Sequence, residues 1–264
     1  MIPLKSSTLI SLILENRMVE KTRVDQLWTV AAASLRDACG NELLARKWKL
    51  SYVELCKNQE RKGRIEQLPP KESARTLLHA LGRGHALIKQ AIEWDTPLIG
   101  KSESKTTKDR TRGILWRYVM AYCGWDCCTN SIGIQQATQE QLLTHTKPLP
   151  APKLTISQIK EISDWIPDGL ETDEEQPEIV DGQWINSFLG IRKQYKEFPS
   201  WLLGKESSLS DIAILALLRN VVAHGSLSPT KAEAWGLVDV YVEGVSVVEQ
   251  LLENLLSELT IEPR

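Results

Sequence analysis

The sequence predicts an all-α protein, with a helical bundle toward its carboxyl end and additional helices on its amino side. Apolar residues recur three and four positions apart through most of the chain, as in helices with one buried face. Alternating strands joined by Asn-Gly or Asp-Gly turns are missing. The 264 residues are 42% apolar and 25% charged, which is typical of globular proteins. A chain of this length can bury a core in one large or two modest domains.

The amino side is expected to contain three helices. Residues 22–60 carry helical apolar spacing and are interrupted at Gly40 and Asn41, which suit a helix end, so two helices fit there. The prolines of "LPPK" then precede a third helical pattern that stops ahead of Pro97. We expect this helix to be broken or kinked around Gly82 and Gly84.

A polar segment divides the chain into two predicted domains. Residues 96–111 are rich in lysine and poor in large side chains, which is typical of a linker. We therefore expect a helical region of unknown role over residues 1–95 and a second helical domain over residues 112–264. The lysines of the linker could guide RNA electrostatically, but a polar linker explains them equally well.

The second domain is expected to be helical, with two exceptions. Residues 147–153 read as an extended proline-rich connection and residues 167–182 as an acidic loop. Helical spacing covers residues 114–128, 135–145, 155–166, 183–203 and 238–259. Ser228 and Pro229 read as the start of the last helix. Period-two alternation leaves a short strand pair open as an alternative within residues 238–248.

Composition excludes several classes of protein. The net charge of −2 gives no general basic excess for nucleic-acid binding, although a local basic cleft would suffice for an enzyme. No apolar run reaches the ~18 residues of a membrane span, and no secretory leader is recognised. The odd count of five cysteines favours buried thiols in a cytoplasmic protein. The cluster "CGWDCC" lacks a second Cys or His pair, so we expect no metal site and no cofactor.

One helix combines an apolar pattern with three polar groups near its end. Residues 210–225 have Ser210 or Ser208 as cap, Asp211 in the first turn and a terminal glycine, which places His224 on the last helical turn. At about 100° per residue, Asn220 and His224 share a face, whereas Arg219 lies about 140° from His224. These groups converge only if His224 turns at a frayed end or if a second copy of the helix faces the first.

The three residue types suit RNA cleavage. An unperturbed imidazole titrates near ~6.5 and can move protons, while a guanidinium stays charged and forks onto phosphate oxygens. A base can activate the ribose 2′-hydroxyl to attack the adjacent phosphate while Arg219 stabilises the developing charge. The alternative is structural: Arg219 pairs with a carboxylate, and His224 caps helix carbonyls with Asn220 as a partner. Polar groups inside an apolar helix favour the functional interpretation, because unpaired polar groups cost stability.

The stretch "LLRNVVAHG" resembles the Arg-Asn-x-x-x-His signature of the HEPN superfamily of nucleotide-binding helical domains. The resemblance covers about residues 112–260 and implies a helical bundle that dimerises, pairing two motifs across one cleft. It also implies metal-independent endoribonuclease activity, with Arg219 and His224 catalytic and Asn220 supporting. By the same resemblance the protein would be a toxin or antiviral defence effector, restrained by an antitoxin or other regulatory protein. Asp126, in "WRYVMAYCGWD", and Lys231 are candidates for further contacts to RNA.

Other interpretations of the chain remain open. Arg75, His79, Arg83 and His85 could form a second basic site, although the spacing of His79 and Arg83 favours a solvated helix face. The chain could also be a non-catalytic module in which the motif binds a nucleotide or RNA. A purely structural partner protein is the third interpretation.

Overall fold

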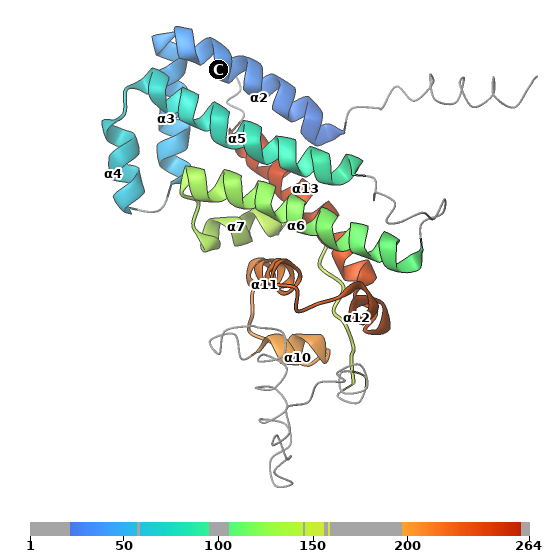
Figure 1. Ribbon diagram of the computed structural model, residues 1–264. Coiled ribbons are helices and arrows are strands. Elements are labelled where there is room, and N and C mark those ends of the chain that lie inside the picture. The colour runs from blue at the N-terminus through green and yellow to red at the C-terminus, as the bar shows by residue number, and fades with distance from the viewer. Residues whose placement is uncertain are drawn as a thin grey trace, which may run out of the picture.

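The computed structural model describes residues 22–56, 59–94, 106–144, 146–155, 158 and 197–259. Over these residues the protein contains ten helices and no strand, which confirms the predicted all-α helical bundle. Helices α2, α5 and α6 lie side by side, and α13 packs across them (Figure 1). α11 packs against α6 and α7.

The amino-side helices begin and end as their capping residues predict. α2 (Arg23–Gly40) is capped by the Thr22 side chain, which accepts from the Asp25 amide. Asn41 ends α2 and caps α3 (Glu42–Leu55) by accepting from the amides of Leu43 and Leu44. The break expected at Gly40 and Asn41 is therefore confirmed. A further short helix, α4 (Gln59–Gln67), connects α3 to α5 and was not expected.

The expected break at Gly82 and Gly84 is wrong, because α5 (Pro70–Glu93) runs unbroken through both glycines. Gly84 instead allows a close approach to α6 (Thr107–Ile132). A Cβ atom on Gly84 would lie 2.1 Å from the Cys128 sulfur and 2.6 Å from the Gly124 carbonyl oxygen. A Cβ atom on Gly124 would lie 2.6 Å from the Gly84 carbonyl oxygen. The two glycines therefore bring the α5 and α6 backbones together.

The segment expected as a linker is partly helical. Residues 95–105 lie outside the described residues, but α6 begins at Thr107, inside the expected linker. Thr106 and Asp109 form a capping box, each side chain accepting from the other residue's amide. This local signal overrides the polar composition of the segment. One hydrophobic cluster contains buried residues from α2, α3, α5, α6 and α13, and the division into two domains stays a prediction.

The sequence predicts that the last helix begins at Ser228 and Pro229, but the carboxyl end contains two separate helices. Ser228 caps α12, which covers only Pro229–Ala234. Gly236 has a φ of 61°, a left-handed conformation that interrupts the chain before α13 (Val238–Leu259). The last helix therefore starts at Val238, not at Pro229. The alternative strand pair at 238–248 is wrong, since these residues are helical and bury a continuous apolar face.

The remaining predicted elements are only partly described. α7 (Gln136–Leu143) confirms the short helix expected at 135–145, and residues 147–153 have no regular structure, as expected. α10 (Phe198–Leu202) is the described part of the helix expected at 183–203. Most of the expected helix at 155–166 and the whole acidic loop at 167–182 lie outside the described residues.

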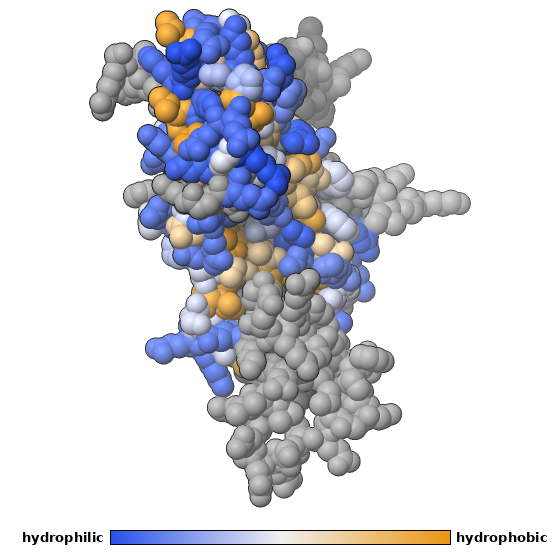
Figure 2. Space-filling model, turned by 90° about the vertical axis from the view of Figure 1, so that its left-hand side faces the viewer, coloured by the Kyte–Doolittle hydropathy of each residue, from blue (hydrophilic) through white to orange (hydrophobic). Residues whose placement is uncertain are grey.

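The surface at the α3 and α4 end of the molecule is mainly hydrophilic, with separate small hydrophobic groups (Figure 2). Among the described helices, none is both long enough and apolar enough to cross a membrane.

Candidate functional site

The helix that carries the motif is α11 (Asp211–Ala223), and its boundaries follow from its end residues. The Ser210 side chain accepts from the Ala213 amide and caps the amino end, as expected. Gly225 has a φ of 72°, and its amide donates to the Val222 carbonyl. His224 is the C-cap residue, one position beyond the last helical residue, rather than a member of the last turn.

Two buried tyrosines attach α11 to the bundle. The Tyr118 hydroxyl on α6 donates to the Leu215 carbonyl at 2.6 Å, and the Tyr241 hydroxyl on α13 donates to the Leu218 carbonyl at 3.1 Å. Burial raises the pKa of both phenols well above the ordinary value, so both remain protonated donors. Their rings meet edge to face with centroids 5.1 Å apart. Sequence reasoning did not identify these residues, because a core tyrosine has no distinctive local pattern.

Arg219 points from α11 toward α6. Its Nη2 donates to the Asp126 carboxylate at 2.8 Å, and its guanidinium carbon lies 5.5 Å from the centre of the Tyr122 ring. The Arg219 and Asp126 side chains are 28% and 31% exposed, so the pair lies at the edge of the core. The structure thus brings together two residues that the sequence singled out separately.

Asn220 and His224 lie on the most open face of α11. Asn220 is half-buried and His224 exposed, and neither side chain forms a hydrogen bond or ion pair with another residue that the structure describes. The same face, about 100° wide, contains three small residues, all exposed or half-buried: Ala213, Ala216 and Ala223. Arg219 lies at the border between this face and α6. Within the described part of the chain, α11 therefore presents the imidazole and, in part, the amide on the same face.

Lys231 is not brought to Asp126. It lies on α12, which contacts the beginning of α6 through a 2.5 Å hydrogen bond from Thr111 to Glu233. Thr111 and Asp126 are fifteen residues apart on α6, which is about 22 Å along the helix axis. Burial lowers the pKa of the Lys231 amine. A contact between Lys231 and RNA stays a prediction, but it would lie away from the Arg219–Asp126 pair.

The cysteines are free thiols, and two of the five are buried, Cys56 and Cys128. The expectation of buried thiols therefore holds for these two, while the other three are only partly buried. Cys123 is next to the Arg219–Asp126 pair, and burial raises its pKa more than the Arg219 charge lowers it. A thiol with a raised pKa is a poor nucleophile at neutral pH.

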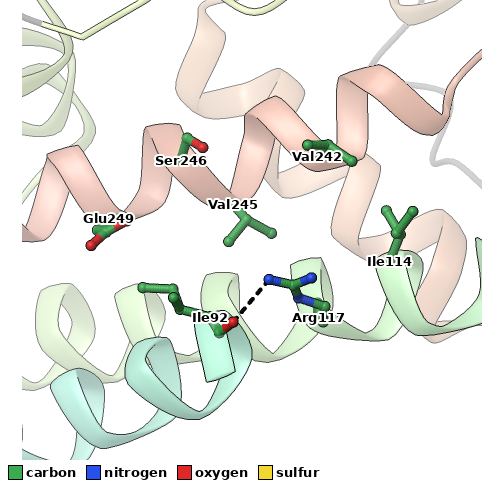
Figure 3. A pocket seen from close by; sticks show the side chains of 7 residues that line it. All are labelled: Ile92, Ile114, Arg117, Val242, Val245, Ser246 and Glu249. Carbon is green, nitrogen blue, oxygen red and sulfur yellow. Dashed lines mark hydrogen bonds between the residues drawn. The ribbon is translucent and has the colours of Figure 1, made fainter. Parts of the chain in front are cut away.

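The described residues also line a small pocket of about 150 Å³ between α5, α6 and α13 (Figure 3). Its lining residues are Ile92, Ile114, Arg117, Val242, Val245, Ser246 and Glu249. The Arg117 guanidinium donates to the carbonyls of Ala91 and Ile92 at the end of α5, so helix capping already uses part of its donor capacity. Arg117 and Asp126 are nine residues apart on α6, which places the pocket on the opposite face of that helix from Arg219.

The proposed second basic site is divided between surface and core. Arg75, His79 and Arg83 are exposed, as a solvated helix face predicts, whereas His85 is buried against α2. His85 Nε2 lies 2.7 Å from the Asp25 carboxylate, and because a carboxylate can only accept, this nitrogen carries the proton. Lys89 donates to the other Asp25 oxygen at 3.0 Å, and Trp28 stacks on the imidazole. The cluster joins α2 to α5.

The His85 cluster makes the stability of the fold depend on pH. Burial lowers the pKa of His85, while Asp25 and Glu93 favour its charged form and Lys89 opposes it. Because the folded-state pKa is below that of the unfolded chain, unfolding takes up a proton in this range, and stability falls as the pH drops below about 6.5. Burial raises the pKa of Asp25, but hydrogen bonds from Lys89 and His85 outweigh burial and lower it, so Asp25 loses stabilising effect only in stronger acid.

We expect the melting temperature to fall between about pH 7.5 and 5.5, and His85→Gln to reduce this dependence. Thermal unfolding followed by circular dichroism at several pH values measures both effects. The matched control is His79→Gln, which changes an exposed histidine on the same helix and should leave the pH dependence unchanged. Equal slopes for the wild type and His85→Gln would contradict the assignment.

In comparisons with protein-family models, with curated proteins and with solved structures, no match to this chain was found.

Proposed function

We propose that the protein is an endoribonuclease that cleaves RNA through 2′-hydroxyl attack, at a site formed by Arg219, Asn220 and His224. One observation carries the proposal: α11 is firmly packed, yet its end presents an exposed imidazole without a protein partner among the described residues. A cation anchored by the neighbouring helix lies at the border of the same face. A helix end built only for stability has no need of this combination.

The proposed chemistry divides the reaction between two groups. His224 removes the proton from the ribose 2′-hydroxyl, and the resulting oxygen attacks the adjacent phosphorus. The bond from phosphorus to the 5′-oxygen breaks, leaving a 2′,3′-cyclic phosphate on one product and, after protonation, a 5′-hydroxyl on the other. Arg219 stabilises the negative charge on the phosphoryl oxygens, and Asn220 holds the imidazole or a phosphoryl oxygen.

A second copy of the chain would complete the proposed site. Arg219 and His224 lie about 140° apart around α11, so one helix does not aim both groups at one phosphate. Two α11 helices facing each other would bring the Arg219 of one copy toward the His224 of the other. The small residues Ala213, Ala216 and Ala223 on the open face would permit this close approach. We therefore propose a homodimer as the active form.

The resemblance to the HEPN superfamily also supports a proposal for the role of the protein in the cell. We propose a cytoplasmic toxin or antiviral defence effector, whose activity an antitoxin or other regulatory protein restrains. The five free thiols agree with a reducing compartment.

A non-catalytic module is the second candidate function, and the Arg219–Asp126 ion pair favours it. An arginine already paired with a carboxylate can serve the fold alone, joining α11 to α6. In that case the open face of α11 would bind RNA or a nucleotide, or join two copies, without cleavage.

RNA cleavage in the presence of a metal chelator tests the proposal. We expect the purified protein to cut single-stranded RNA and to leave 2′,3′-cyclic phosphate and 5′-hydroxyl ends, which end-specific enzymatic labelling detects. RNA methylated at every 2′-oxygen should stay intact, since its nucleophile is blocked. If unmodified RNA remains intact, or the methylated RNA is cut equally fast, the proposed mechanism is wrong.

A further inference from the structure

Arg219 has few ways to bind an additional anion. Its Nε atom is buried and has no hydrogen-bond partner within the described part of the chain. An incoming phosphate cannot reach that nitrogen, so it must bind through the two Nη groups. One of these, Nη2, already donates to Asp126. A phosphate that binds Arg219 therefore competes for the same donors as the Asp126 carboxylate.

Asp126 also opposes an anion by its charge. Among the described residues it is the only hydrogen-bond partner of the Arg219 guanidinium, and it cancels the positive charge at this end of α11. A phosphodiester at Arg219 would lie within a few ångströms of this carboxylate. The attraction from Arg219 and the repulsion from Asp126 would then nearly offset each other.

Tyr122 keeps the guanidinium in place without the carboxylate. The ring lies 5.5 Å below the guanidinium carbon, and its 4% exposure shows that it is fixed in the core. Cation–π stacking of this kind orients an arginine while its outer edge stays available. Removing the negative charge of Asp126 should therefore leave Arg219 close to its present position.

We infer that Asp126 is an internal competitor that weakens phosphodiester binding at Arg219. This inference rests on the proposed function, because it assumes that Arg219 binds an RNA phosphate. Asp126 then limits how tightly the site holds RNA until the phosphate displaces the carboxylate from Nη2. The sequence suggested Asp126 as a further contact to RNA, whereas the ion pair assigns it the opposite effect.

The test compares the binding of one probe to wild type and Asp126→Asn. The probe is a fluorescent single-stranded RNA methylated at every 2′-oxygen, which retains the phosphates but lacks the 2′-hydroxyl nucleophile, and fluorescence anisotropy gives its Kd. Asparagine keeps an oxygen acceptor for Nη2 and removes the charge. We expect binding about fivefold tighter at low salt, the effect of one unit charge about 4 Å away in water.

The salt dependence separates displacement at Arg219 from a general change in charge. In the wild type the displaced Asp126 carboxylate takes up a cation, which offsets one cation released from the RNA. Asp126→Asn has no such charge, so its slope of log Kd against log salt should be steeper by about 0.7 for a single strand. Asp37→Asn changes the net charge equally at an exposed position on α2 and should alter neither Kd nor slope. Melting temperatures of all variants show whether folding is preserved, and Asp126→Ala provides a second removal of the charge.

Each outcome decides between the two claims. Weaker binding in Arg219→Ala together with tighter binding in Asp126→Asn supports both the site and the competition. Weaker binding in Arg219→Ala with unchanged or weaker binding in Asp126→Asn and Asp126→Ala overturns the competition and leaves the site intact. Arg219→Ala that binds the probe as tightly as the wild type overturns both.

Discussion

His224→Ala is expected to reduce the rate of RNA cleavage by about 10²- to 10⁴-fold, the range that a positioned general base contributes. His224 supplies the only imidazole on the open face of α11 within the described chain, so no neighbour there can replace it. Single-turnover cleavage of a labelled RNA measures the loss directly. Because His224 is exposed and makes no side-chain hydrogen bond to a described residue, the melting temperature should change little.

The matched control is His79→Ala. His79 is also exposed, but it lies on α5 and outside the candidate site, so this variant should retain full activity. Cleavage by His224→Ala at the wild-type rate would exclude His224 as the base. An equal loss in both variants would show that the assay reports general damage rather than the site.

Gly84→Ala is expected to destabilise the fold by about 3 kcal/mol, the upper part of the usual range for overpacking. The new methyl group would lie 2.1 Å from the Cys128 sulfur and 2.6 Å from the Gly124 carbonyl oxygen. A side chain can rotate away, but the Gly124 carbonyl belongs to the α6 backbone, so the two helices must separate. Urea unfolding of wild type and variant measures the change in the free energy of unfolding.

Gly63→Ala provides the control in α4, where no described atom outside the helix's own neighbouring backbone lies within 4 Å of the new Cβ. This substitution should stabilise the protein by about 0.5–1 kcal/mol, because alanine favours a helix more than glycine does. Adding Cys128→Ala to Gly84→Ala should restore only part of the loss, since the carbonyl contact remains. If Gly84→Ala unfolds at the same urea concentration as the wild type, the close contact of α5 and α6 is wrong.

The sequence predicted helix ends well where the signal is local. Ser210, Gly225 and Asn41 act on backbone groups within a few residues, and each caps or ends a helix as expected. The Thr106–Asp109 capping box is an equally local signal, and it starts α6 inside a segment whose polar composition predicts a linker. Gly236 likewise marked the end of α12.

Contacts between distant segments could not be predicted from spacing. Periodicity shows which face of a helix is buried but not which helix covers it. It therefore predicts a break at Gly84 and does not reveal the close contact of Gly84 with Gly124. The same limit applies to His85: its spacing places it among exposed basic neighbours, whereas its partner Asp25 lies sixty residues earlier. The sequence singles out Asp126 as a candidate contact to RNA. That Arg219 is its partner follows only from the packing of α11 on α6.

The two tyrosines that attach α11 have a consequence for assembly. Tyr118 and Tyr241 bind carbonyls of neighbouring turns, Leu215 and Leu218, from two different helices. These bonds prevent α11 from sliding along its axis or rotating about it. The open face is therefore preorganised, and two copies would meet as rigid bodies with little entropy lost in ordering α11. Their association would be limited by diffusion and orientation and would require no refolding step.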